Sequence, residues 1–391
     1  MRAGELLERA QTMQEDYARD LAALVAIDSG SDDPDGVNLV ADWIETRLRS
    51  LGFAVSRSSA GAPQYGDVLV GRRQGNGSGT VVLFGHMDTV FERGDAARRP
   101  FSVDADGLAH GPGVCDDKAG VVAGLHAAAH LIAAGDERYG ELVLVFTPDE
   151  EIGSPVGGPA LQSVARGADV ALCLECAREN GDLVLARKGA VDLVLEVEGV
   201  AAHSGIEPER GVHAGLEAAH LTVFLQALAD PAARLTVNVG MLRAGERTNV
   251  VPDRAVLHVE ARAAEAAVLN GVIDRIRARC VDPAVPGARI TVREIDHCPP
   301  MEAGPDALRL GDLALEVAGE LGFAPALART GGVSDANRVA ALGVPTLDGL
   351  GPVGGGDHSP VEWLDLASVP QRVALLATLI EEAPAQLRGE G

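Results

Sequence analysis

The stretch TVVLFGHMDTV, residues 80–90, is the starting point for interpreting this chain. Residues 80–84 form an almost uninterrupted apolar run, which is typical of a strand buried on both faces of a parallel sheet. The run ends at Gly85, and His86 and Asp88 follow directly. Because ligands bind beyond the carboxyl ends of the strands in an open α/β sheet, we expect both side chains to lie at a functional edge.

Similar apolar runs on either side of this stretch predict further strands of the same sheet. Amphipathic stretches between them predict helices, and this alternation is typical of a mostly parallel sheet covered by helices. The predicted strands are 67–70, 80–85, 141–147 and 169–174, and the predicted helices are 119–134 and 159–166.

The pattern changes near residue 188 and changes back after the two prolines at 299–300. Residues 189–298 read as strand, helix, strand, strand, helix, strand, which is the order of a small ferredoxin-like α+β domain. Helix and strand then alternate again over residues 307–382. We therefore expect a discontinuous α/β domain, residues 1–188 and 299–391, interrupted by an inserted βαββαβ domain at 189–298.

Five loops place histidine or carboxylate residues next to predicted strands or glycine-rich turns. They are GHMDTV at 85–90, GPGVCDDK at 111–118, DEE at 149–151, Glu175, and DHSP at 357–360. Each fragment alone is more often an ordinary polar pair or a solvated turn. Their shared position after buried strands favours a metal site, and imidazole with carboxylate suits Zn²⁺, Co²⁺ or Mn²⁺.

Composition narrows the class of protein. The formal net charge of −24 argues against nucleic acid or an anionic membrane as a partner. No apolar run approaches the length of a membrane span, and the polar N-terminal segment does not resemble a secretory leader. With five cysteines, an odd number, these features predict a reducing, cytoplasmic location. For the Cys173–Cys176 pair we favour packing at a strand end over a metal or redox role.

With these motifs in place, the chain resembles the two-zinc metallopeptidases that include aminoacylase, succinyl-diaminopimelate desuccinylase and bacterial glutamate carboxypeptidase. The resemblance covers nearly the whole chain. The glutamate carboxypeptidase branch is the most similar, through the motifs GPGVxDDK, DEExGS and RTGG at residues 111–118, 149–154 and 329–332. It implies a di-zinc catalytic domain with an inserted dimerisation or lid domain.

The resemblance also implies a ligand set for two divalent metal ions, zinc in the first place, with cobalt or manganese as options. His86 and Glu175 would hold one ion, and Glu151 and His358 would hold the other. Asp116 would bridge both ions.

The same resemblance assigns catalytic roles. Glu150 would be the general base and acid, and Asp88 would orient the imidazole of His86. The peptide bond between Asp116 and Asp117 would be cis. His203, in the inserted domain, would reach across the interface of a homodimer and stabilise the developing oxyanion.

Candidate substrate-binding residues follow from the matched motifs. They are Asn249, Arg262, Arg329, Gly331 and Gly332. Arg262 also fits an exposed position on an edge strand. The glycine loop also fits a connection that precedes a helix capped by Ser334 or Asp335.

Two positions bear on the substrate. Relatives that carry glutamate at the position of Glu175 act on substrates recognised through an acid, whereas di- and tripeptidases usually carry aspartate. Cys298 stands where folate-cleaving carboxypeptidases carry an arginine for the terminal carboxylate, and a thiol cannot replace a guanidinium. Glutamate recognition would then need Arg262, Arg329 or Arg338.

These observations favour a metal-dependent hydrolase that cleaves an amide bond of a peptide or an N-acyl amino acid, as a carboxypeptidase or amidohydrolase. One alternative is an aminopeptidase or dipeptidase of the same family. A less favoured alternative is a non-catalytic, dimeric binding protein, because all five ligand positions and Glu150 are present.

Overall fold

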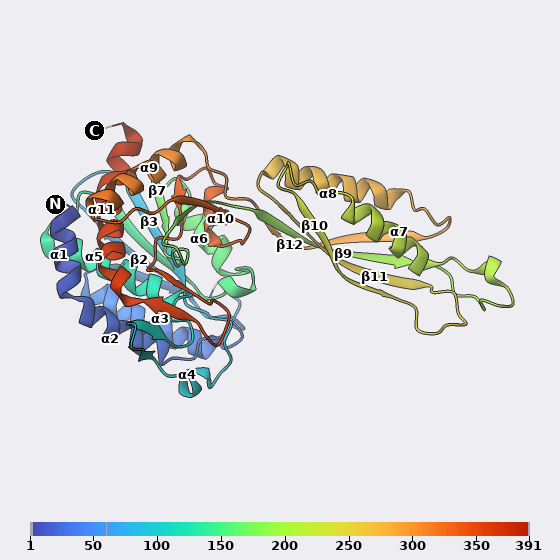
Figure 1. Ribbon diagram of the computed structural model, residues 1–391, viewed down its shortest axis with the longest axis horizontal. Coiled ribbons are helices and arrows are strands. Elements are labelled where there is room, and N and C mark those ends of the chain that lie inside the picture. The colour runs from blue at the N-terminus through green and yellow to red at the C-terminus, as the bar shows by residue number, and fades with distance from the viewer. Residues whose placement is uncertain (1–2, 60, 390–391) are drawn as a thin grey trace. The chain divides into compact units, whose positions relative to one another are not determined.

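The computed structural model describes residues 3–59 and 61–389 and divides into two units (Figure 1). Unit 1 contains Met1–Leu185, Ala303–Arg329 and Ser334–Gly391. Unit 2 contains Ala186–Glu302 and Thr330–Val333. Among the described residues, helices with the length and apolar character needed to span a membrane are absent.

Unit 1 is built on a six-stranded sheet. Its strand order is β1 (Ala54–Ser58), β2 (Val68–Gln74), β6 (Glu141–Thr147), β3 (Thr80–His86), β7 (Val170–Cys173), β14 (Thr346–Leu347). The central strand β3 is parallel to both β6 and β7, and β14 is parallel to β7. The prediction of a mainly parallel sheet is therefore confirmed, and the apolar runs of β3 and β6 are buried as expected.

The outer strands β1 and β2 differ from the rest of this sheet because they run antiparallel to their neighbours. Strand β1 was not predicted, because its residues are only half-buried or exposed and carry no continuous apolar run. An edge strand of this kind has little hydrophobic signal because only one of its faces packs on the core.

Helices enclose the sheet of unit 1. Helix α5 is buried along most of its length, and both α5 and α11 contact β3. The helices of unit 1 are α1 (Ala3–Thr12), α2 (Gln14–Val25), α3 (Pro34–Ser50), α4 (Asp95–Arg98), α5 (Lys118–Ala134), α6 (Gly157–Ala165), α9 (Pro305–Glu320), α10 (Asp335–Ala340) and α11 (Val369–Arg388), with short 3-10 turns η1 (Glu150–Ile152) and η3 (Leu366–Ser368).

Two further small sheets were not predicted. One has the order β15 (Gly354–Gly355), β16 (Trp363–Asp365), β5 (Leu108–His110), β4 (Ser102–Val103), and the other pairs β8 (Leu183–Arg187) with β13 (Leu327–Thr330). Their strands are mostly too short to leave a periodic pattern in the sequence. The first sheet joins the segment before Asp116 to the segments that flank His358.

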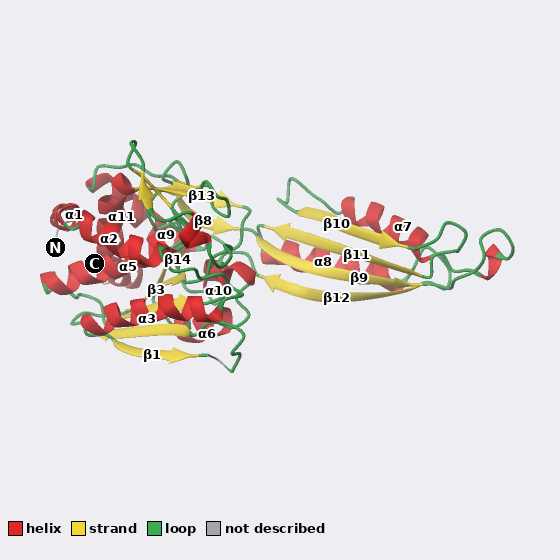
Figure 2. Cartoon of the chain, turned by 90° about the horizontal axis from the view of Figure 1, so that it is seen from below, coloured by secondary structure: helices red, strands yellow, loops and turns green. Residues whose placement is uncertain are grey.

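Unit 2 has the predicted order of strands and helices. Its elements are β9 (Gly189–Glu198), η2 (Pro208–Arg210), α7 (Ala214–Gln226), β10 (Thr236–Ala244), β11 (Arg254–Ala263), α8 (Ala266–Val281) and β12 (Arg289–Cys298). The antiparallel sheet has the order β10-β11-β9-β12, and Figure 2 shows both helices on the same side of it. Their apolar side chains form a separate hydrophobic core, so unit 2 is a layered α+β unit.

Candidate metal centre

The loops that follow three neighbouring strands of unit 1 carry the predicted ligands. His86 ends β3, Glu150 and Glu151 begin η1 after β6, and Glu175 lies two residues after β7. Gly85 permits the close approach at the end of β3, because a Cβ atom there would lie 2.3 Å from Oδ2 of Asp117. The remaining ligands come from the loops before α5 and after β15.

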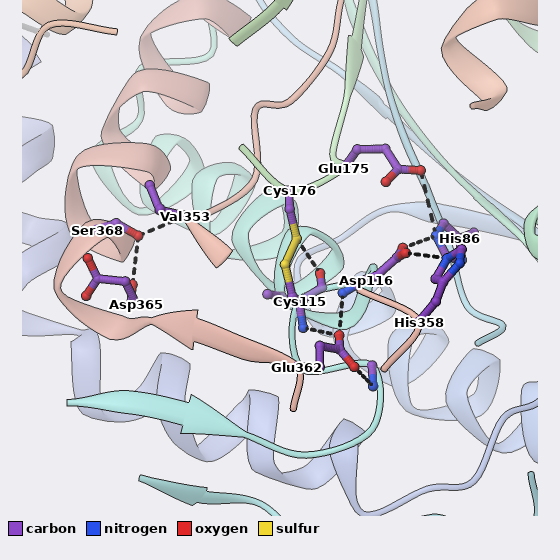
Figure 3. Close-up of a disulfide and its surroundings, with 12 residues drawn as sticks. His86, Cys115, Asp116, Glu175, Cys176, Val353, His358, Glu362, Asp365 and Ser368 are labelled. Carbon is purple, nitrogen blue, oxygen red and sulfur yellow. Dashed lines mark hydrogen bonds and ion pairs between the residues drawn. A yellow bond between two sulfur atoms is a disulfide. The ribbon is translucent and has the colours of Figure 1, made fainter. Parts of the chain in front are cut away.

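Asp116 lies at the centre of the cluster (Figure 3). Its Oδ1 is 2.8 Å from Nε2 of His86, and its Oδ2 is 3.2 Å from Nε2 of His358. Nε2 of His358 also lies 3.0 Å from Oε2 of Glu151, and Nε2 of His86 lies 3.7 Å from Oε1 of Glu175. Nε2 of each imidazole therefore faces Asp116 and one further carboxylate, Glu175 for His86 and Glu151 for His358.

Buried carboxyl groups give this cluster an excess of negative charge that cations would neutralise. Burial raises the pKa of the carboxyl groups of Glu150, Glu151 and Glu175. Oε1 of Glu151 is buried without a hydrogen-bond partner. The nearby ammonium group of Lys118 donates instead to the carbonyl of Ile27. Buried carboxylates with two imidazoles and an unsatisfied oxygen are the donor set that divalent zinc-like cations require.

The two imidazoles respond to these acids. Hydrogen bonds to Asp116 and Glu151 raise the pKa of His358 to about 10. His86 is desolvated by burial, but its hydrogen bonds to Asp116 and Asp88 outweigh this effect and raise its pKa. Both rings thus lie in a strongly negative environment, which favours the binding of cations.

Asp88 connects His86 to the loop that carries the two glutamates. Its Oδ1 accepts the backbone N–H of Glu150 at 3.0 Å, and its Oδ2 accepts that of Glu151 at 3.1 Å. Oδ1 also lies 3.3 Å from Nδ1 of His86, and the hydroxyl of Ser31 donates to Oδ2 at 2.6 Å. Asp88 is fully buried, so its carboxylate positions both loops at once.

Two further buried acids support these loops and were not predicted as site residues. The carboxylate of Glu362 accepts the backbone N–H groups of Gly113, Cys115 and Asp116, at 2.8 to 2.9 Å. The carboxylate of Asp335 accepts the hydroxyls of Thr147 and Ser154, on either side of the glutamate doublet. Glu362 follows His358 by only four residues, which is the one local signal that singles it out.

The cysteines differ from expectation. Cys115 and Cys176 form a disulfide that spans 61 residues of sequence, and Figure 3 shows it beside Asp116 and Glu175. The interpretation of Cys176 as a residue that only packs at a strand end is therefore wrong. The pairing partner of Cys176 is a residue of another loop, so the spacing of Cys173 and Cys176 carried no information about it. Cys173, Cys280 and Cys298 are buried and lie outside the disulfide.

The peptide bond between Asp116 and Asp117 is cis, which confirms the expectation from the resemblance. His358 has a positive φ of 60°, a conformation that is uncommon for residues other than glycine and that clusters at functional sites.

The remaining candidates are divided between the units. His203, Asn249, Arg262, Gly331 and Gly332 belong to unit 2, and Arg329 belongs to unit 1. His203 and Asn249 are exposed. Arg262 donates to the carbonyl of Gly331 at 2.9 Å and pairs with Glu260 at 2.7 Å, so it joins β11 to the glycine loop. Ser334 caps α10, as the alternative interpretation of this loop expected.

Comparison with known proteins agrees with this geometry. The profile of the family described as peptidase family M20/M25/M40 matches residues 82–382. Carboxypeptidase G2 from Pseudomonas sp. (strain RS-16) is 33% identical over 381 residues, which cover 96% of this chain and 91% of that protein. Succinyl-diaminopimelate desuccinylase from Xanthomonas euvesicatoria pv. vesicatoria is 29% identical and covers 86% of this chain and 92% of that protein.

Solved structures share the fold. The aminopeptidase PepT from Bacillus cereus superposes with a TM-score of 0.81 at 24% identity, covering 95% of this chain and 98% of that one. A metallo-carboxypeptidase, Sso-CP2, from Sulfolobus solfataricus has a TM-score of 0.71 at 15% identity and covers 94% of this chain and 99% of that one. At these identities the structures establish the architecture but not the substrate.

Proposed function

The chain belongs to peptidase family M20/M25/M40 and is a metal-dependent hydrolase, and from this premise we propose how it acts and on what. It hydrolyses an amide bond of a peptide or N-acyl amino acid that carries a carboxylate next to the scissile bond. Two divalent cations, zinc in the first place, bind to His86, Asp116, Glu151, Glu175 and His358. The observation that carries this proposal is the carboxylate of Asp116, which faces one imidazole with each of its oxygens.

Glu150 is the proton-transfer residue of this proposal. When bound, the two cations supply positive charge that acidifies a water molecule and polarises the scissile carbonyl. The carboxylate of Glu150 accepts a proton from the attacking water and then delivers it to the leaving nitrogen. Burial raises the pKa of Glu150, which is the direction that strengthens a carboxylate as a proton acceptor.

The neighbouring glutamates offer a matched test of this division of roles. Glu150→Gln should lower kcat by about 10²–10⁴-fold, which is the usual contribution of a general base, while the protein keeps both zinc ions. Glu151→Gln should instead lower the zinc content. Steady-state kinetics and metal analysis of both variants check this. Full activity in Glu150→Gln would contradict its assignment.

Substrate selection is proposed to depend on a carboxylate bound by unit 2. Arg262, beside Gly331 and Gly332, supplies the guanidinium in the absence of an arginine at position 298. Its pairing with Glu260 leaves its side chain 30% exposed, so it can reach a ligand. Asn249 and Arg329 are proposed as additional contacts.

A substrate panel separates this proposal from the aminopeptidase alternative. N-acyl amino acids with a free carboxylate should be cleaved, and their carboxamide analogues should show a higher KM. Arg262→Ala should remove this preference, whereas Arg254→Ala, an exposed arginine on the same strand, should keep it. Turnover of unblocked peptides alone would favour the alternative instead.

We further propose a cytoplasmic homodimer that forms through residues around 200 to 245, with His203 completing the site of the partner subunit. Support comes from β10, which lies at the edge of the sheet of unit 2. Apolar side chains are exposed on β10 and on the adjacent α7, namely Leu216, Val223, Met241 and Leu242. Together they form a surface suited to a two-fold contact.

A further inference from the structure

The disulfide joins the two loops whose carboxylates flank His86. Cys115 immediately precedes Asp116, and Cys176 immediately follows Glu175. The Cα atoms of the two cysteines are 6.1 Å apart, within the range that a disulfide spans. The bond therefore connects the backbones of two proposed ligands through a single side-chain bridge.

One end of this bridge is held firmly by other contacts. The three N–H groups around Cys115 and Asp116 bind the carboxylate of Glu362, which is only 1% exposed. Sγ of Cys115 also packs against Gly354, where a Cβ atom would lie 2.4 Å from it. The loop of Asp116 is therefore anchored whether or not the sulfur atoms are bonded.

At the other end, the backbone is anchored but the Glu175 carboxylate is held less completely. N–H of Leu174 donates to the carbonyl of Phe84 at 2.8 Å, N–H of Gly351 to that of Glu175 at 2.9 Å, and N–H of Ala177 to that of Pro352 at 3.2 Å. The carboxylate of Glu175 has only the 3.7 Å contact with His86 among the described ion pairs. The bridge from Cys176 is thus the covalent restraint closest to this carboxylate.

We propose that Cys115 and Cys176 are a thiol–disulfide site that controls how firmly the metal centre retains the cation at His86 and Glu175. This inference rests on the proposed function. In the oxidised form, the bridge holds the Glu175 loop against the anchored Asp116 loop, and metal loss is slow. In the reduced form, the Glu175 loop moves more freely, and the cation at that position is released faster.

The chemistry of the switch is a two-electron exchange. Oxidation by a small-molecule disulfide forms the Cys115–Cys176 bond and converts that oxidant into two thiols. Reduction by a phosphine with one water molecule breaks the bond, gives two protein thiols and forms the phosphine oxide.

Zinc release and thiol counting test the inference on the native chain. Zinc-loaded protein is prepared oxidised and after phosphine treatment, and its thiols are alkylated under denaturing conditions and counted by mass spectrometry. The oxidised form should show three free thiols of the five cysteines. Transfer of the first zinc ion to a coloured chelator should be about tenfold faster after reduction. This factor is comparable to the loss of metal affinity when a contact that orients a ligand is removed.

Two variants complete the experiment. Cys115→Ser/Cys176→Ser should release the first zinc ion fast under both conditions. Cys280→Ala, which removes an unpaired cysteine of unit 2, should behave like the native chain. Five free thiols in the oxidised sample would overturn this inference but not the proposed function. The same holds if both states bind two zinc ions and the oxidised and reduced forms release them at the same rate. Native protein that binds no zinc in either state would contradict the proposed function as well.

Discussion

At the scale of single residues, Asp88 links the histidine end of the site to its glutamate end. One buried carboxylate accepts two backbone N–H groups and a hydroxyl, and it also contacts an imidazole. All four contacts need oxygen acceptors. The identity of this residue therefore sets the relative position of His86 and Glu150, although Asp88 is not one of the proposed metal ligands.

Replacing Asp88 by asparagine should test this role. The amide keeps the shape but has only one acceptor oxygen, so one of the N–H groups of Glu150 and Glu151 loses its partner. We expect activity or zinc affinity to fall by about 10–100-fold. Steady-state kinetics measures the activity, and zinc titration measures the affinity. Ser31→Ala removes a single donor and should have a smaller effect. Native values for both measurements in Asp88→Asn would show that this carboxylate does not organise the site.

The residues that could be predicted from the sequence are those that lie at the end of a strand or within a few residues after it. His86, Glu151 and Glu175 share this position, and a parallel sheet brings such positions together. Glu362 and Asp335 could not be found in this way, because their partners lie about 180 to 250 residues away along the chain. The disulfide was missed for the same reason, since its two cysteines meet only after the sheet forms.

At the scale of elements, helix α5 packs closely against the loop that carries Glu175. A Cβ atom at Gly120 would lie 1.8 Å from the carbonyl oxygen of Leu174 and 2.2 Å from Oδ1 of Asp117. This glycine therefore allows the first turn of the helix to approach β7 and the loop of Asp116. The predicted helix at 119–134 matches α5 closely, but its apolar sequence did not show which residue makes the closest contact.

Two glycine substitutions test this packing. Gly120→Ala should lower the free energy of unfolding by about 1–3 kcal/mol, because the backbone cannot move away without cost. Gly271 lies in helix α8, and a Cβ atom added there by the change to alanine would have no atom within 4 Å. Gly271→Ala should be neutral or stabilise by up to about 1 kcal/mol. Denaturant unfolding measures both, and equal effects would contradict the close contact at Gly120.

At the scale of the whole molecule, the chain combines a unit that holds the metal ligands with a unit that has its own core. Each unit has a separate hydrophobic cluster, so a change on the surface of unit 2 should leave the metal ligands of unit 1 in place. The order of elements in unit 2 and the buried strands of unit 1 could be predicted from hydrophobic periodicity, whereas helix α3 was not predicted. The antiparallel β1 and the short sheets could not, because they lack a buried apolar run.

Disruption of the proposed dimer surface is the prediction at this scale. Val223, on α7, is 73% exposed, and Val223→Glu should shift the protein from dimer to monomer because it places a charge in an apolar contact. Val281, on α8, is 84% exposed, and Val281→Glu should leave the dimer intact. Sedimentation analysis distinguishes the two species. A native chain that is monomeric and active would remove His203 of the partner subunit from the proposed site.

The most direct test of the account is a crystal structure of the zinc-loaded protein with anomalous diffraction measured at the zinc edge. The account predicts two zinc peaks per chain with Asp116 between them. One peak should lie within bonding distance of His86 and Glu175, and the other within bonding distance of Glu151 and His358. A single peak, or peaks bound by other residues while these five side chains bind none, would contradict the account.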